Sequence, residues 1–175
     1  MRIVTVLAVA AVAALGEVVY VIGGASATGE TGLIQAIDLA TGKVSEGPFG
    51  DTSSEFPRVA ESLTGRPTRY GYACPQRSWE FEFDFEGVYK YDFHTDDVVA
   101  HMYSPTEVCG EHVFAPDPDG TAEDDGWLLS FVTDRATETS ELVILDARDV
   151  AGAPVARVQM ATRVPLGFHA HWFAD

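Results

Sequence analysis

Cysteine and basic residues are scarce in this chain of 175 residues. Its two cysteines, Cys74 and Cys109, lack CxxC spacing, so they indicate neither a disulfide framework nor a zinc site. Eleven Lys and Arg stand against 27 Asp and Glu, which gives a net charge of −16. The negative field repels phosphate backbones and anionic lipid, and we therefore expect no nucleic-acid partner.

A long uninterrupted apolar run is also missing. Residues 3–22 reach the roughly 20 apolar residues of a membrane span only if Glu17 is tolerated. The apolar segment 1–27 has two other interpretations, since residues 17–22 read as a buried strand, and the run behind Arg2 with Ala25-Ser26-Ala27 resembles a secretory signal. A third possibility is that Met1 is not the true start. We rank a strand or a misplaced start above a signal, and a signal above an anchor, and expect a cytoplasmic protein with export left open.

Residues 28–175 contain three copies of a hairpin pattern, in which an apolar strand ends in aspartate and is followed by a polar turn and a second strand. The copies cover residues 33–44, 88–99 and 142–158. Their aspartates, Asp38, Asp92 and Asp146, are 54 residues apart in both intervals. This period is close to the blade length of the longer propeller repeats, about 50 residues. The pattern therefore predicts an all-β chain and a partial β-propeller built from small antiparallel sheets.

Each hairpin is followed by a predicted strand in which a polar residue stands beside an aromatic one. The polar residues are Glu55, Glu111 and His169, separated by 56 and 58 residues. Because the innermost strands of propeller blades border one axis, we expect these three side chains to converge there. An imidazole ligand with a carboxylate on its other ring nitrogen suits a metal. Taken singly, each Glu reads as a surface residue, and His169 reads as a core histidine bonded to a backbone carbonyl.

Three motifs together resemble the carotenoid cleavage oxygenases, a family that includes the lignostilbene dioxygenases and the retinoid isomerase. The first is Glu-Phe-Pro-Arg-Val at 55–59, followed by Gly-Arg-Pro at 65–67 and Tyr-Gly-Tyr-Ala at 70–73. The second is Gly-Glu-His-Val-Phe at 110–114 with the segment 122–130, and the third is Arg-Val-Pro-Leu-Gly-Phe-His at 163–169. Their order and spacing are similar to the carboxyl-terminal third of that family, from about residue 33 to residue 175.

The resemblance implies a seven-bladed propeller with a non-haem Fe(II) on its axis, held by four histidines. By that pattern His169 is one iron ligand, and Glu55 and Glu111 orient other ligating histidines. Enzymes of this family use O2 to split a carbon–carbon double bond of an apolar conjugated substrate. The substrate is a carotenoid, apocarotenoid or stilbene, and weak membrane association would help the enzyme to reach it.

Several histidines depart from the family pattern. His112 stands where the family usually has proline, Ala170 where it usually has glycine, and His171 is unexpected in its segment. His112 and His171 match no family ligand, so we interpret both as non-ligands. We also exclude two further histidines as metal ligands. His94 lies in a predicted hairpin turn, and His101 lies on a predicted exposed strand edge.

The length is a further departure, because three repeats cannot close a ring that needs 4–8 blades. Three of the expected histidines have no matching segment here. The sequence therefore predicts a fragment of an Fe(II)-dependent dioxygenase that is inactive by itself. Two alternatives are a non-catalytic propeller module gripping an apolar ligand between Trp127, Trp172 and Phe173, and a secreted structural domain. The aromatic residues that alternate with acidic ones over 79–85 are interpreted as core.

Overall fold

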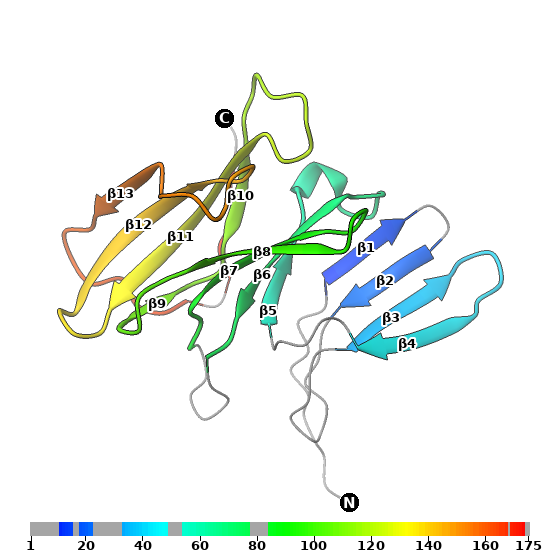
Figure 1. Cartoon of the computed structure of the whole chain (residues 1–175), viewed down its shortest axis with the longest axis horizontal. Helices are drawn as coiled ribbons and strands as arrows, with labels where there is room; N and C mark the ends of the chain where they lie inside the picture. The colour runs from blue at the N-terminus through cyan, green and yellow to red at the C-terminus, as the bar shows by residue number, and fades with distance from the viewer. Residues whose placement is uncertain are drawn as a thin grey trace, which may run out of the picture.

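The chain was analysed as a computed structural model, which describes residues 11–15, 18–22, 33–48, 54–77, 84–167 and 169–173. These residues form β-strands in three antiparallel sheets, with one short 3-10 turn at Glu61–Leu63. Figure 1 shows the three sheets following one another in chain order. The predicted all-β fold class is thus confirmed. The alternating stripe predicted as core over 79–85 lies mostly in 78–83, outside the described residues.

The first sheet has the order β1-β2-β3-β4. Its strands are β1 (Ala11–Leu15), β2 (Val18–Ile22), β3 (Leu33–Asp38) and β4 (Val44–Pro48). The strands β1 and β2 lie within the apolar amino-terminal segment. The structure thus has a strand where residues 17–22 were interpreted as one, and it pairs with β3 along its whole length.

The second and third sheets repeat this arrangement. The second has the order β5-β6-β7-β8, with β5 (Ser54–Arg58), β6 (Tyr70–Pro75), β7 (Gly87–Asp92) and β8 (Asp97–Met102). The third has the order β10-β11-β12-β13, with β10 (Val113–Pro116), β11 (Gly126–Asp134), β12 (Thr139–Asp146) and β13 (Ala156–Gln159). The short β9 (Glu107–Cys109) pairs with the far end of β11.

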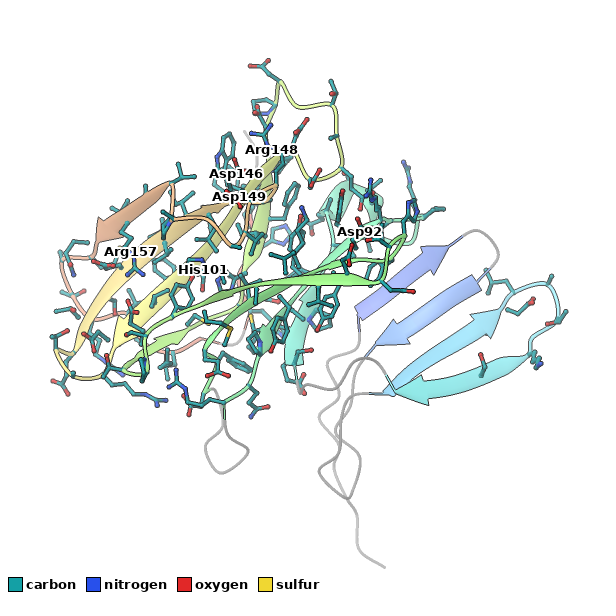
Figure 2. All side chains as sticks on the ribbon, in the orientation of Figure 1. Asp92, His101, Asp146, Arg148, Asp149 and Arg157 are labelled. Atoms are coloured by element: carbon teal, nitrogen blue, oxygen red, sulfur yellow. The ribbon has the colours of Figure 1, made fainter. Side chains whose placement is uncertain are left out.

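The repeated aspartates end the third strand of each sheet, β3, β7 and β12. In all three turns the carboxylate Oδ1 accepts a hydrogen bond from the backbone N–H two residues further on. These N–H groups belong to Ala40, His94 and Arg148, at 3.0, 3.0 and 2.9 Å. An aspartate that bonds its own turn favours a tight reversal, and this explains why aspartate recurs at the same position of each sheet. Figure 2 shows Asp146 and Arg148 together at the end of β12.

The second and third sheets pack face to face around a shared core. Its fully buried side chains come from both sheets and include Tyr72, Val88, Leu128 and Val143. The ring of Tyr72 stacks on that of Phe114, with centroids 5.9 Å apart. Lys90 crosses the junction, where Nζ lies 2.6 Å from Asp124 Oδ2 and 2.7 Å from the carbonyl oxygen of Ala147. Neighbouring blades of a propeller pack in this way.

The three predicted inner strands are only partly correct. Glu55 lies on β5, but Glu111 precedes β10 by two residues, and residues 169–173 form no strand. The amide of Ala170 donates instead to the Glu111 carboxylate at 2.7 Å. A segment becomes a strand by bonding to a neighbouring strand, and this amide bonds to a side chain instead.

No helix within the described part of the chain is long and apolar enough to cross a membrane.

Candidate functional site

Glu111 is the centre of the candidate site. Its side chain is only 2% exposed, in the loop between β9 and β10. It accepts two hydrogen bonds from Arg58 at the end of β5, at 2.6 Å from Nε and 2.9 Å from Nη2. The Arg58 Nη2 also donates to the carbonyl oxygen of Ala170 at 2.7 Å. This bidentate pair therefore joins the second sheet, the third sheet and the carboxyl-terminal tail at one point.

His169 lies beside this pair. Its Nδ1 is 3.5 Å from Oε1 and 3.4 Å from Oε2 of Glu111, and its side chain is 49% exposed. The edge of its ring contacts Phe56, with centroids 5.4 Å apart. The structure thus brings together two of the three predicted site residues. The role predicted for Glu111, the orientation of a different histidine, stays a prediction.

Glu55 precedes Phe56, whose ring contacts His169, but no contact joins the Glu55 side chain to Glu111 or His169 within the described residues. Phe56 has a φ of 53°, and the pairing of β5 with β6 shifts register between Glu55 and Arg58. A bulge of this kind re-aims the side chains that follow it, and here Arg58 reaches Glu111. Partial burial raises the pKa of Glu55, because the low-dielectric surroundings disfavour its charged form.

An apolar cavity of about 540 Å³ opens next to His169. Its walls come from the outer face of β11 and β12 and from the tail. The main apolar lining residues are Val113, Leu129, Phe131, Leu142, Leu166 and Trp172. Glu111, His169 and His171 place polar groups at the same cavity. Of the three aromatic residues predicted to grip an apolar ligand, Trp172 lines this cavity, whereas Trp127 and Phe173 are not among its lining residues.

The described residues do not form a metal site by themselves. They contain no group of three or more His, Cys, Asp or Glu placed to hold a metal ion. Beside Glu111 lies one imidazole, that of His169, and the Glu111 carboxylate is already bonded to Arg58. A four-histidine shell would need further imidazoles beside His169, so its role as an iron ligand stays a prediction.

Two of the histidines excluded as ligands have other partners. His171 Nε2 lies 3.2 Å from Glu61 Oε2, and its ring packs against Phe173. His101 was expected on an exposed strand edge, but it is half-buried, and its Nδ1 lies 3.2 Å from the carbonyl oxygen of Val150. The prediction was wrong because the loop after β12 covers this part of β8, as Figure 2 shows for His101.

His112 is part of a buried polar group that the sequence did not reveal. Its Nδ1 lies 3.5 Å from Cys74 Sγ, and its Nε2 lies 3.0 Å from the hydroxyl of Tyr103. The pKa of Cys74 is lowered by a hydrogen bond with Cys109 and, less strongly, by His112, against the effect of burial. Burial raises the pKa of Cys109. Residues 38 apart in sequence give no periodic signal for such a contact.

Three antiparallel sheets in chain order, with a polar site where two of them meet the tail, define a segment of a β-propeller. Solved structures support this fold. Cobalt-substituted Synechocystis ACO matches with a TM-score of 0.77 at 24% identity, covering 92% of this chain and 37% of that one. An ACO/RPE65 chimera matches with a TM-score of 0.81 at 22% identity, covering 95% of this chain and 39% of that one.

Sequence comparison adds the family. The chain belongs to the RPE65, retinal pigment epithelial membrane protein, family, whose profile matches residues 17–174. The apocarotenoid-15,15'-oxygenase of Synechocystis sp. is 32% identical over 136 residues, and the carotenoid cleavage oxygenase of Mycobacterium tuberculosis is 34% identical over 149 residues. Both alignments cover 78% of this chain and 28% of the relative, so the chain spans little more than a quarter of these proteins. The predicted resemblance is confirmed.

Proposed function

We propose that this chain is part of an Fe(II)-dependent dioxygenase that uses O2 to cleave a double bond of a carotenoid, apocarotenoid or stilbene. Its relatives are apocarotenoid and carotenoid cleavage oxygenases, and this supports the reaction class. The observation that carries the proposal is the contact between Glu111 and His169 beside an apolar cavity. A conjugated hydrocarbon suits such a cavity, because apolar walls bind it and a few polar groups orient it.

Each site residue then has a role. Glu111 would accept a hydrogen bond from Nδ1 of His169, 3.5 Å from its Oε1, and would so select the tautomer whose Nε2 lone pair can bind a metal. Arg58 holds the Glu111 carboxylate in place through two hydrogen bonds. Glu55 would orient a further ligating histidine from outside the described residues. A bound iron would supply the O2 chemistry, and the apolar walls would limit access of water to the substrate.

The experiment replaces the matching segment of the Synechocystis apocarotenoid oxygenase with residues 33–175 of this chain. We expect the chimera to bind iron and to cleave an apocarotenoid. His169→Ala should then remove most of the iron, while Glu111→Gln should weaken iron affinity by roughly 10–100-fold, the usual cost of losing a group that orients a metal ligand. His171→Ala, which changes the neighbouring imidazole, is the matched control and should keep its iron.

Two outcomes would contradict the proposal. Retention of full iron content by the His169→Ala chimera would exclude the ligand role of this residue. Stoichiometric iron and O2-dependent cleavage by the 175-residue chain alone would exclude its interpretation as an incomplete part of the enzyme. Both are measured by metal analysis and by chromatography of the carbonyl products.

A non-catalytic binding module is the second candidate, and the cavity beside Trp172 favours it. In that case the metal-free chain should bind an apocarotenoid and quench tryptophan fluorescence. Trp172→Phe should reduce the quenching, whereas Trp127→Phe, outside the cavity lining, should not. Equal quenching in the two variants would place the ligand elsewhere.

A further inference from the structure

Four buried side chains form a polar cluster between the second and third sheets. Cys74 comes from β6, Cys109 from β9, Tyr103 from the segment after β8, and His112 from the segment before β10. All four side chains are buried, and Cys74 is completely inaccessible to solvent. The rings of Tyr103 and His112 stack, with centroids 5.9 Å apart. The candidate functional site uses none of these side chains.

The hydrogen bonds of the cluster place Nδ1 of the His112 imidazole next to the sulfur of Cys74. The Tyr103 hydroxyl can donate to Nε2 of His112, which leaves the hydrogen on Nδ1, 3.5 Å from Cys74 Sγ. An N–H donor at this position stabilises a thiolate, the form in which cysteine is a nucleophile. His112 stands where the family that the sequence resembles usually has proline, and proline has no side chain able to make this bond.

The second thiol lies beside the first. The two thiols interact with each other, and the Sγ of each can donate a hydrogen bond to a backbone carbonyl. These carbonyl oxygens belong to Gly110, 3.7 Å from Cys74 Sγ, and to Gly87, 3.4 Å from Cys109 Sγ. Gly110, whose carbonyl oxygen lies 3.7 Å from Cys74 Sγ, also lines the cavity beside His169.

We propose that Cys74 and Cys109 are a redox-active thiol pair, which a hydroperoxide converts into a disulfide that joins the second and third sheets. The Cys74 thiolate attacks one peroxide oxygen, the O–O bond breaks, and the leaving hydroxide takes a proton from solvent, so that Cys74 becomes a sulfenic acid. Cys109 then attacks this sulfur, the S–O bond breaks, and the leaving hydroxide takes the proton of the Cys109 thiol to form water. With hydrogen peroxide the balance is two thiols and one peroxide to one disulfide and two waters.

The acidities of the two thiols assign their roles. Cys74 is the attacking group, because His112 Nδ1 lies 3.5 Å from its Sγ and its pKa is lowered, whereas burial raises the pKa of Cys109. The disulfide would act as a brace, since it connects β6 of one sheet with β9 of the next. This inference is independent of the proposed dioxygenase activity.

The experiment exposes the full chain to hydrogen peroxide, then unfolds it and alkylates the remaining thiols. Because the chain has only two cysteines, an intramolecular disulfide can only be Cys74–Cys109. We expect alkylation to fall from two thiols to none, and tryptic peptides 70–77 and 91–135 to migrate as one species until they are reduced. Thiols that stay reduced in the folded chain, or disulfides only between chains, would overturn the proposal.

Variants separate the roles within the cluster. Cys109→Ser should stop the reaction at a Cys74 sulfenic acid that dimedone traps, and Cys74→Ser should give no such adduct. His112→Gln should slow oxidation at least tenfold, while folding is checked by circular dichroism. If His112→Gln does not fold, Tyr103→Phe removes the hydroxyl that sets the tautomer and takes its place. An unchanged oxidation rate, or no adduct in Cys109→Ser, would contradict the proposed mechanism.

Discussion

At the residue scale, the candidate site depends on one ion pair. Glu111 is buried, and Arg58 satisfies both of its carboxylate oxygens. Hydrogen bonding to Glu111 raises the pKa of Arg58, so the guanidinium stays charged throughout the accessible pH range. The motif at 55–59 contains Arg58, but its role became visible only when the structure placed it against a residue 53 positions away.

Removal of this guanidinium should destabilise the chain. Arg58→Met removes the charged partner of the buried Glu111 carboxylate, which then keeps only its contacts with His169 and the Ala170 amide. Breaking a buried pair costs about 3–5 kcal/mol, and because the Arg58 side chain is 27% exposed we expect a loss of about 2–3 kcal/mol. Urea unfolding followed by circular dichroism measures the change.

Arg148→Met is the control for this substitution. It removes a guanidinium of similar size that lies on the surface, 62% exposed, in longer contacts with Asp146 and Asp125. Its unfolding midpoint should stay close to that of the unchanged chain, because exposed ion pairs are screened by water. An equal loss of unfolding free energy in both variants would mean that the Arg58–Glu111 pair stabilises the fold no more than an exposed ion pair does.

At the element scale, two local features shape the sheets: the aspartate turns and the close pairing of strands at glycine. The aspartate turns recur at the end of the third strand in every sheet. Gly87 begins β7 opposite Met102 of β8, where a Cβ atom would overlap the carbonyl oxygen of His101. The absence of a side chain at this residue allows the two strands to pair closely.

Gly87→Ala should therefore weaken the β7–β8 pairing. The added methyl group must displace backbone rather than a flexible side-chain end, and we expect a cost of roughly 1–3 kcal/mol, as for other overpacked positions. Gly167→Ala is the matched control, since a Cβ there meets no atom within 4 Å. Thermal unfolding of both variants tests the prediction, and equal midpoints would show that β8 moves away without cost.

At the scale of the whole molecule, the acidic composition acts against compactness. The net charge is −16, so the folded chain repels itself more than the expanded one does. Raising the salt concentration from about 0.01 M to about 1 M shortens the screening length from roughly 30 Å to roughly 3 Å. We therefore expect the thermal unfolding midpoint to rise with NaCl.

The variant Asp96→Asn with Asp119→Asn removes two exposed negative charges and should show a smaller rise. Asparagine tolerates the positive φ of 58° at residue 96 as aspartate does, so the backbone is not perturbed. A midpoint that falls with salt would show that ion pairs such as Arg58–Glu111 outweigh the net repulsion.

The sequence by itself determined the all-β class, the three-fold repeat and the family, because turn-forming aspartates and alternating strands are local features that keep their spacing. It also predicted that Glu111 and His169 share one site. Only the tertiary structure decided that Arg58 pairs with Glu111, that residues 169–173 form no strand, and that His112 meets Cys74. All three depend on interactions between different sheets, or between a sheet and the tail. Side chains that meet across such a junction are not regularly spaced in the sequence, so no periodic pattern predicts their contact.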